Sequence, residues 1–168
     1  RDWSSDVCSS DLRQAARGPA AARNLALRHA RAELIAFIDA DDIWLPGKLQ
    51  AHLAVMAQCP HVDAVYGAFE RWEPHGGQYR AMPGRSAYEA QPVLPLSPAL
   101  ADAEALRPGH LYVDMLQSSA IHIITALVRR QAVDAVQGFD EQCATGSDYD
   151  FWLRLSRQAL LVRLAAPL

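Results

Sequence analysis

The sequence has 168 residues, of which 51% are hydrophobic and 21% charged, a balance typical of one globular domain and sufficient to build a core. Sixteen Lys and Arg residues against nineteen Asp and Glu residues give a formal net charge of −3, which excludes the basic surface of a nucleic-acid-binding protein. The longest apolar runs, such as residues 120–128, are far shorter than the ~20 residues of a membrane-spanning helix. The three cysteines follow neither a disulfide nor a zinc pattern, so we expect a reduced, cytoplasmic protein.

The first twelve residues, RDWSSDVCSSDL, differ from the rest of the chain. They have no hydrophobic period and lack the apolar segment of a signal peptide. Their back-translation resembles a common sequencing-library adapter, so we expect residues 1–12 to be an artefact without a fold. The alternative is a native polar tail. On the first interpretation the domain starts at residue 13 and its upstream part is missing.

In chain order, the first predicted element is a helix over 19–31, opened by a Gly-Pro pair and carrying apolar side chains at helical spacing. A continuous apolar run over 34–38 predicts a strand buried on both faces, and this strand ends abruptly in the acidic segment 39–42. A proline opens a second helix over 46–59, and residues 62–69 form the next predicted strand.

Residues 70–109 are rich in proline and glycine and have no sustained period, which predicts a long loop with a short helix near 98–106. The elements expected after it are a strand over 121–128, a helix over 129–136 closed by Gly138, a helix over 147–158 capped by Ser147, and a strand over 160–164. Strands alternate with helices, which indicates an α/β fold with at least partly parallel strands.

The clearest chemical signal is FIDADD at 37–42, where a buried strand ends in the carboxylates Asp39, Asp41 and Asp42. Such a strand places them at the carboxyl edge of a sheet, where open α/β sheets bind ligands. Clustered carboxylates repel each other unless a cation joins them, and hard oxygen ligands suit Mg²⁺ or Mn²⁺ with phosphate oxygens in the shell. The alternative is a solvated acidic turn in which Asp42 caps the next helix.

A second acidic signal is SDYDFWLR at 147–154. Asp148 and Asp150 flank the start of a predicted helix, while Phe151 and Trp152 can pack inward. A carboxylate held on the end of a rigid helix is suited to act as a general base. The alternative is a helix N-terminus with acids that favour the helix dipole.

Several segments occur in a characteristic order: ARN at 22–24, FIDADDIWLPGKL at 37–49, VDAVYG at 62–67, LVRR at 127–130, GFDE at 138–141 and SDYDFWLRL at 147–155. Together they resemble the inverting, nucleotide-sugar-dependent glycosyltransferases of family 2, over roughly residues 18–165. The resemblance implies a GT-A-like α/β fold with a mostly parallel sheet flanked by helices, incomplete at its N-terminus.

The resemblance also implies roles for the residues of the first acidic motif. Asp41 matches the metal ligand that bridges to the donor diphosphate, and Asp39 would lie near the metal or the donor ribose. Asp42 would cap the next helix or support the site. Arg23 matches the arginine of the ARN motif and would lie near the donor nucleotide; an ion pair with a neighbouring carboxylate is an equally weighted alternative.

Further roles come from the later motifs. Asp148 matches the general base, although many relatives carry Glu immediately before it where this chain has Ser147, and Asp150 would support the site. Trp72, in the predicted loop excursion, is the candidate for a sugar contact. His122 lies in a predicted strand and is expected to be a core residue.

The reaction implied is a single displacement. A divalent cation, Mg²⁺ or Mn²⁺, neutralises charge on the departing diphosphate, while Asp148 takes the proton of an acceptor hydroxyl that attacks with inversion. The expected partners are a nucleotide-sugar donor, foremost a UDP-sugar, and a glycan or lipid-linked acceptor in cell-surface or extracellular polysaccharide synthesis. Such a hexosyltransferase would work in the cytoplasm, either free or at the cytoplasmic face of a membrane.

Relatives begin with a strand, a helix and a second strand that hold the nucleotide base, and residues 13–17 supply none of these elements. We therefore expect residues 13–168 to be a partial catalytic domain that is weak or inactive by itself. Apolar surface on the strand at 34–38 would then be exposed.

Two other functions fit parts of the sequence. A non-catalytic sugar- or protein-binding module would retain the fold without depending on Asp41. A metal-dependent phosphohydrolase would use Asp39 as its nucleophile. That chemistry usually requires a phosphate-binding turn after the acids, and this chain has the apolar segment 43–46 there.

Overall fold

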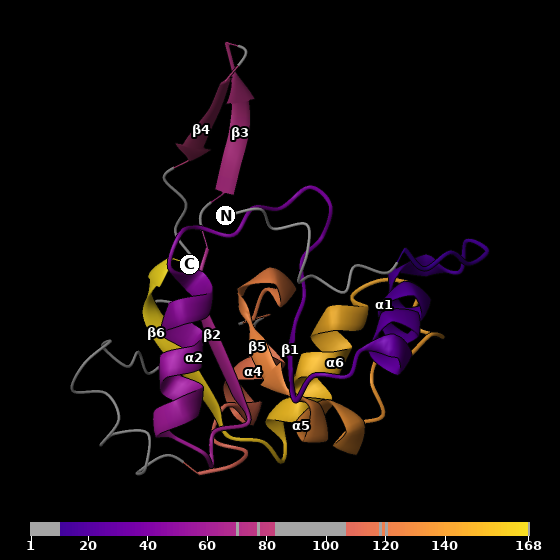
Figure 1. The fold of residues 1–168 in the computed structure, drawn as a ribbon, viewed down its shortest axis with the longest axis vertical. Coiled ribbons are helices and arrows are strands. Elements are labelled where there is room, and N and C mark those ends of the chain that lie inside the picture. Colours follow the sequence, from indigo (N-terminus) through magenta and orange to yellow (C-terminus); the bar gives the residue numbers. More distant parts are fainter. Residues whose placement is uncertain are drawn as a thin grey trace.

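The computed structural model describes residues 11–69, 71–76, 78–82, 107–117, 119 and 121–167. At its centre is a four-stranded sheet in the order β1 (Leu34–Ala36), β5 (Leu127–Arg129), β2 (Ala64–Ala68) and β6 (Leu161–Pro167) (Figure 1). A separate hairpin of β3 (Arg71–His75) and β4 (Gln78–Met82) projects beyond one end of this sheet. The predicted α/β class is confirmed.

Three of the four strands of the central sheet run in the same direction. β5 is antiparallel to both of its neighbours, with Ile35 opposite Val128 and Val65 opposite Leu127, whereas β2 and β6 are parallel. Since β1 and β2 are each antiparallel to β5, they share one direction with β6. The expectation of a mostly parallel sheet therefore holds for strand direction but not for pairing, because two of the three pairings are antiparallel.

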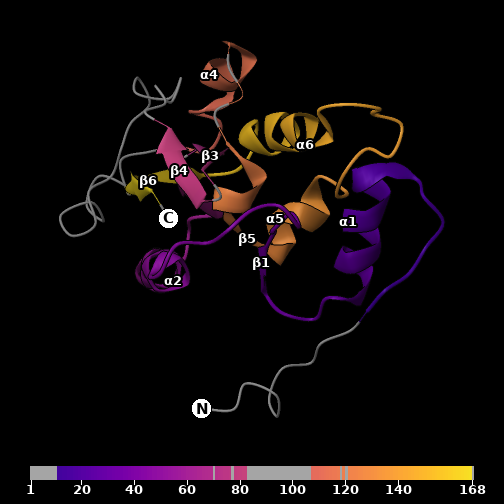
Figure 2. The same cartoon turned by 90° about the horizontal axis from the view of Figure 1, so that it is seen from above.

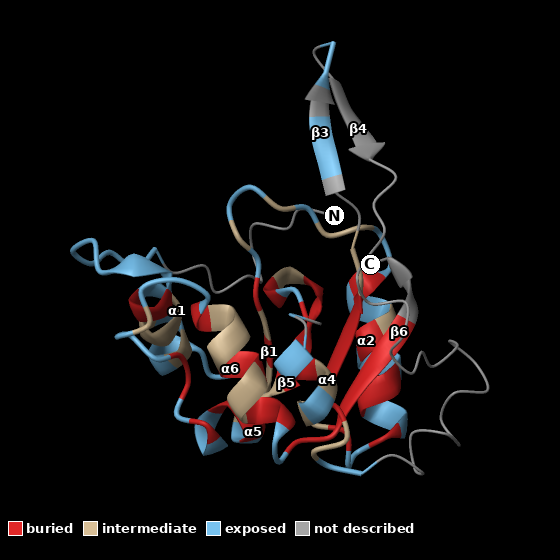
Figure 3. Cartoon of the chain, turned by 180° about the vertical axis from the view of Figure 1, so that it is seen from behind, coloured by how far each residue is buried: buried red, intermediate tan, exposed pale blue. Residues whose placement is uncertain are grey.

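Helices cover both faces of the sheet (Figure 2). One face packs against α2 (Lys48–Gln58), and the other against α1 (Gly18–His29), α4 (Tyr112–Gln117), α5 (Arg130–Ala135) and α6 (Ser147–Ser156). Successive side chains of a strand point to opposite faces, so Tyr66 of β2 joins the core beneath α6 and Val65 joins the core beneath α2. Figure 3 shows the resulting band of buried residues along the central strands.

The helices begin and end where local chemistry favours it. In α1, Gly18 adopts a φ of +85° and is followed by a proline in the first turn, while Arg28 and His29 occupy the last turn, where the helix dipole favours basic groups. The predicted helices at 19–31, 46–59 and 129–136 and the strands at 62–69 and 160–164 are confirmed within a few residues. Among the described helices, none is long and apolar enough to cross a membrane.

The prediction of a continuous loop over 70–109 is wrong for its first part, where Arg71–His75 and Gln78–Met82 pair as the two strands of the hairpin. Its two strands pair from Arg71 opposite Met82 to His75 opposite Gln78, around a turn in which Gly76 has a φ of +58°. Pro74 fits in β3 because a strand in a two-stranded hairpin has an unpaired edge that needs no N–H donor. Residues 83–106, including the predicted short helix near 98–106, lie outside the described residues.

The prediction of a strand over 121–128 is wrong for its first part, because Ile123–Thr125 form a single 3-10 turn. Strand pairing begins only at Leu127. Both the backbone N–H and the hydroxyl of Thr125 donate to the carbonyl of His122, at 3.0 Å and 2.7 Å, which favours the turn over a ladder.

Two further expectations need correction. The helix at 147–158 forms, but its N-cap is Gly146 with a φ of +69°, and Ser147 is buried without a capping hydrogen bond. The strand at 34–38 was expected to be buried on both faces. Leu34 and Ala36 are half-buried, and Ile38 is 53% exposed, which agrees instead with the exposed apolar surface also expected there.

Candidate active site

The topology brings three chain segments to one edge of the sheet (Figure 1). Residues 39–42 follow β1 after two further residues, Phe37 and Ile38. Because β5 runs opposite to β1, the residues that precede it, including His122, lie at the edge where β1 ends. A short turn joins α6 to β6, which is parallel to β2, so the first turn of α6, with Asp148, lies at this same edge. We call it the carboxyl edge, since it is where β1, β2 and β6 end.

Asp39 is held at the carboxyl edge by Arg23 of α1. The Arg23 Nη2 atom donates to both carboxylate oxygens of Asp39 at 2.9 Å, and the Arg23 side chain is only 16% exposed. The Arg23 guanidinium also lies 5.5 Å from the ring centre of Phe139. The structure thus contains the ion pair that was one of the two alternatives for Arg23, and a contact of Arg23 with a nucleotide stays a prediction.

The neighbouring residue of the ARN motif ties α1 to the GFDE motif. The Asn24 side-chain amide donates to the carbonyl of Phe139 at 2.8 Å and to Glu141 Oε1 at 3.1 Å, and its oxygen accepts from the backbone N–H of Phe139 at 2.9 Å. Gly138 has a φ of +69°, and a Cβ there would lie 2.7 Å from Asn24 Oδ1. A Cβ at this position would displace the Asn24 amide, so the hydrogen bonds between the two motifs depend on glycine at position 138.

An aromatic cluster positions the start of α6 beside β1. Phe37, Phe139 and Phe151 pack together, with ring centres 5.4 Å apart for Phe37 and Phe139 and 4.5 Å apart for Phe139 and Phe151. Asp148 lies three residues before Phe151, about one helical turn closer to the carboxyl edge. Its side chain is half-buried and forms no hydrogen bond with another described residue.

Asp150 has a structural role in the same helix. Its carboxylate accepts from Arg154 Nε at 2.9 Å and pairs with Arg154 Nη2 at 2.7 Å. The Arg154 guanidinium also donates to the carbonyls of Val136 and Gly138, the latter at 2.9 Å. Asp150 is thus linked through Arg154 to the loop that carries GFDE, and its supporting role in the site stays a prediction.

The remaining acids of FIDADD crowd at the tip of the edge. Asp41 is exposed, and the backbone N–H of Asp42 donates to the carbonyl of Asp39 at 3.2 Å in a tight turn. Partial burial of Asp42, followed by the nearby charges of Asp41 and Asp39, raises the pKa of the Asp42 carboxyl, while His122 acts in the opposite direction. The edge thus concentrates negative charge.

His122 is a site residue that the sequence analysis missed. It was expected in the core, yet it is exposed, and its ring contacts that of Phe69 in a tilted arrangement, with 4.1 Å between ring centres and 44° between the ring planes. The prediction is wrong because residues 121–126 do not form the expected strand. The position of His122 follows from the reversed direction of β5, which a single sequence does not encode in any local pattern.

A buried cation lies behind the acidic loop, at the start of α2. Lys48 is 1% exposed, and its Nζ atom lies 4.3 Å from the centre of the Trp44 ring. Burial lowers the pKa of Lys48 to about 8. His52, also buried, has its ring nitrogens 2.7 Å and 2.8 Å from the carbonyl oxygens of Lys48 and Thr125, which ties α2 to the turn after His122.

The carboxylates of the FIDADD loop are the kind of ligand that a hard divalent cation binds, because they are oxygen donors and the ion would relieve their mutual repulsion. Within the described residues, however, no three His, Cys, Asp or Glu side chains converge on one point that could hold a metal. Asp41 is the acid most open to a ligand, and Asp39 is already engaged by Arg23. A bound ion would therefore need oxygens from the ligand as well.

Trp72, the candidate for a sugar contact, lies on β3 of the projecting hairpin and is 44% exposed. The hairpin leaves the sheet at the carboxyl edge, since β2 ends there (Figure 1). Trp72 thus stays a candidate on the side of the molecule that carries the acids, and its contact with a sugar remains a prediction.

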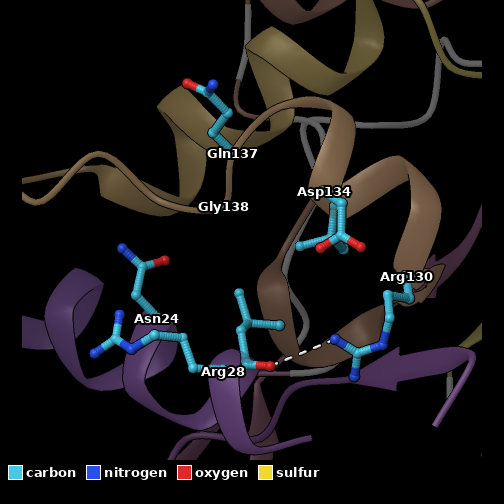
Figure 4. A pocket seen from close by; sticks show the side chains of 8 residues that line it. Asn24, Arg28, Arg130, Asp134, Gln137 and Gly138 are labelled. Atoms are coloured by element: carbon cyan, nitrogen blue, oxygen red, sulfur yellow. Dashed lines mark hydrogen bonds between the residues drawn. The ribbon is translucent and has the colours of Figure 1, made fainter. Parts of the chain in front are cut away.

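A cavity of about 390 Å³ lies elsewhere, between α1 and α5. Figure 4 shows polar side chains around it, among them Arg28, Arg130 and Asp134, with Arg130 donating to the carbonyl of Leu27 at 3.4 Å. Its lining includes Asn24 and Gly138 but none of the acids at the carboxyl edge. We therefore assign the site to the edge and not to this cavity.

Comparison with known sequences yields a match to the model of Glycosyl transferase family 2 over residues 6–112. The Escherichia coli UDP-Glc:alpha-D-GlcNAc-diphosphoundecaprenol beta-1,3-glucosyltransferase WfgD is 42% identical over 55 residues, which are 33% of this chain and 21% of WfgD. An uncharacterized glycosyltransferase of Haemophilus influenzae is 27% identical over 116 residues, which are 69% of this chain and 37% of that protein. The chain thus spans well under half the length of these curated relatives.

Comparison with solved structures yields the crystal structure of S. aureus TarS 1-349. The TM-score is 0.57 at 18% sequence identity, and the match covers 88% of this chain and 38% of the TarS chain. At this identity the likeness concerns the fold alone, and it supports a GT-A-like arrangement of the sheet and helices. The family match begins at residue 6, inside the segment predicted to be an artefact, and the origin of residues 1–12 stays a prediction.

Proposed function

Because the chain belongs to Glycosyl transferase family 2, we propose that it carries the catalytic edge of an enzyme that transfers a sugar from a nucleotide-diphosphate donor to an acceptor hydroxyl. The observation that supports this most is the meeting of the FIDADD loop and the first turn of α6 at the carboxyl edge. In this arrangement the FIDADD loop offers carboxylates for a donor complex, and α6 offers the carboxylate of Asp148, which forms no hydrogen bond with another described residue.

The proposed roles follow the geometry. Asp41 and Asp39 would hold Mg²⁺ or Mn²⁺, which when bound supplies positive charge against the departing diphosphate. Arg23 fixes the orientation of the Asp39 carboxylate through two hydrogen bonds of 2.9 Å. Asp148 accepts the proton of the acceptor hydroxyl as that hydroxyl attacks from the face opposite the leaving group, so the configuration of the sugar inverts.

The donor and acceptor are proposed from a relative. WfgD is named for a UDP-glucose donor and a lipid-diphosphate-linked acceptor. We propose the same classes here: a UDP-sugar and a glycan or lipid-linked acceptor, in synthesis of cell-surface or extracellular polysaccharide. Such an acceptor would place the enzyme in the cytoplasm, at the cytoplasmic face of a membrane.

The test is sugar transfer from a UDP-sugar by the full-length enzyme and by its Asp148→Asn variant, since residues 13–168 alone are expected to be weak or inactive. We expect the variant to lose transfer by about 10²–10⁴-fold, because the general base is gone, with an unchanged melting temperature. The matched control is Asp150→Asn on the same helix, which breaks the ion pair with Arg154. This variant should lower the melting temperature, which Asp148→Asn leaves unchanged, and should lower transfer less than Asp148→Asn does. Equal transfer by wild type and Asp148→Asn would overturn the proposed mechanism.

A further inference from the structure

Lys48 is the only lysine of the sequence, and the fold buries it. It is the first residue of α2, its side chain is 1% exposed, and its Nζ atom has no hydrogen-bond partner among the described residues. The contact that does engage the ammonium is the face of Trp44, 4.3 Å away. A charged amine in such surroundings calls for an explanation, because buried charges are ordinarily paired.

The fold alone does not explain this lysine. Burial disfavours its charged form, with the pKa lowered to about 8. The N-terminus of a helix also disfavours a cation, since the helix dipole is positive there. The unmade hydrogen bonds of Nζ add a third cost. A cation–π contact offsets only part of these costs, and a methionine would fill the same space without them.

Trp44, in contrast, lies where it can restrain the acidic loop. It follows Asp42 by two residues, its Nε1 atom is buried without a hydrogen-bond partner among the described residues, and the adjacent Ile43 is 70% exposed. The described backbone hydrogen bonds of this stretch are short turns, from Asp42 to Asp39 and from Lys48 to Leu45, both 3.2 Å. The loop is thus restrained at Asp39 by the ion pair with Arg23 and, beyond Asp42, by the packing of the Trp44 indole on Lys48.

We propose that Lys48 is a positioning residue of the transferase: its ammonium holds the indole of Trp44 against the start of α2 and so fixes the path of residues 39–45, which present Asp41 to the donor. This inference rests on the proposed function. It explains why Lys48 is present although its burial lowers the free energy of unfolding: the acids of FIDADD must be held in place for binding and catalysis.

The test compares Lys48→Met with Gln50→Met in the full-length enzyme, and the second variant places the same residue at an exposed position in the same turn of α2. Fluorotryptophan labelling gives a fluorine resonance for Trp44, assigned with Trp44→Phe. We expect Lys48→Met to raise the melting temperature, to shift and broaden the Trp44 resonance, and to lower transfer by about 10–100-fold, as a displaced catalytic loop does. Gln50→Met should leave all three readouts near wild type.

A double-mutant cycle separates action through Trp44 from a direct effect of the charge. If Lys48 acts through the indole, Trp44→Leu lowers transfer by a similar factor, and adding Lys48→Met to it lowers transfer no further. Fully additive losses would overturn the proposal, as would a Trp44 resonance unchanged by Lys48→Met. Asp148→Asn is measured in parallel. A loss in Asp148→Asn without one in Lys48→Met contradicts the role of Lys48 alone, and no loss in either contradicts the proposed function itself.

Discussion

Buried polar side chains are hydrogen-bonded to different extents on the two faces of the central sheet. On the face that carries α1 and α6, Asn24 and Arg154 bind the backbone of residues 136–141, and Arg23 binds Asp39, so these charged and amide side chains have partners. The exceptions on that face are single nitrogen atoms, Trp152 Nε1 and Arg130 Nη2, which are buried without a hydrogen bond among the described residues. On the face that carries α2, Lys48 and the indole nitrogen of Trp44 are buried without hydrogen bonds among the described residues. We infer that the first face forms a rigid support for Asp148. On the second face, the buried Lys48 that positions residues 39–45 lowers the free energy of unfolding.

We expect the strongest difference between the two faces in how the free energy of unfolding depends on pH, because Lys48 lies on the face that carries α2. The pKa of Lys48 is about 8 in the folded chain against 10.5 for an ordinary lysine, so between these values the unfolded chain binds the proton and the folded chain does not. The free energy of unfolding of the wild type should therefore rise, relative to that of Lys48→Met, by about 3 kcal/mol between pH 7 and pH 11. Below pH 8 both states are protonated, and the cost of the buried charge is fully present.

Urea unfolding of both proteins across this pH range measures the effect. Because the sequence contains one lysine, a single resonance from lysine labelled at Cε reports the same titration directly. Parallel stability curves for wild type and Lys48→Met, or an ordinary lysine pKa, would show that Lys48 is not buried as described.

A smaller effect probes the opposite face. Gly138 and Gly146 both adopt a φ of +69°, but a Cβ at Gly138 would lie 2.7 Å from Asn24 Oδ1, whereas the nearest heavy atom to a Cβ at Gly146 is 4.0 Å away. Both alanine variants carry the strain of a left-handed backbone, about 1–2 kcal/mol. Gly138→Ala should lose about 1–3 kcal/mol more, because it displaces the hydrogen bonds of Asn24. Equal losses of unfolding free energy in the two variants would contradict the dependence of the Asn24 hydrogen bonds on glycine at position 138.

The smallest expected effect concerns His122 at the carboxyl edge. His122→Ala should change the unfolding free energy by no more than about 0.5 kcal/mol, because the side chain is exposed. It should nevertheless raise the pKa of the Asp42 carboxyl further, since His122 is the nearby group that lowers it. Titration of the Asp42 carboxyl carbon by NMR checks the direction, and a pKa that stays unchanged or falls would place His122 away from the acids.

Local patterns predicted the parts of the site that local chemistry determines. The apolar run before Asp39 predicted a strand that ends in acids, and the acids of α6 predicted a helix start. The family resemblance rested on these ordered motifs and is confirmed by the match over residues 6–112. The roles assigned to Asp41, Asp148 and the other site residues stay predictions.

Long-range features were not predictable in the same way. The reversed direction of β5, which moves His122 from the expected core to the carboxyl edge, depends on which strands pair across the sheet and not on its own three residues. The pairing of Arg23 with Asp39 could be anticipated only as one of two alternatives, because a sequence shows charges but not their separation. The contact between Lys48 and Trp44 was missed, although their spacing of four residues would bring them together if a helix began nearby.

We propose that the FIDADD loop at the carboxyl edge binds the diphosphate of a nucleotide-sugar donor together with a divalent cation. The most direct measurement is a thermal melt of the chain with Mn²⁺ and UDP, separately and together, for wild type and Asp41→Asn. A ligand at a hundred times its dissociation constant adds about 2.7 kcal/mol of stability. We predict a joint Mn²⁺–UDP shift in the wild type that disappears in Asp41→Asn. An equal shift in both proteins would contradict the claim, because the complex would then form without the acid assigned to hold it.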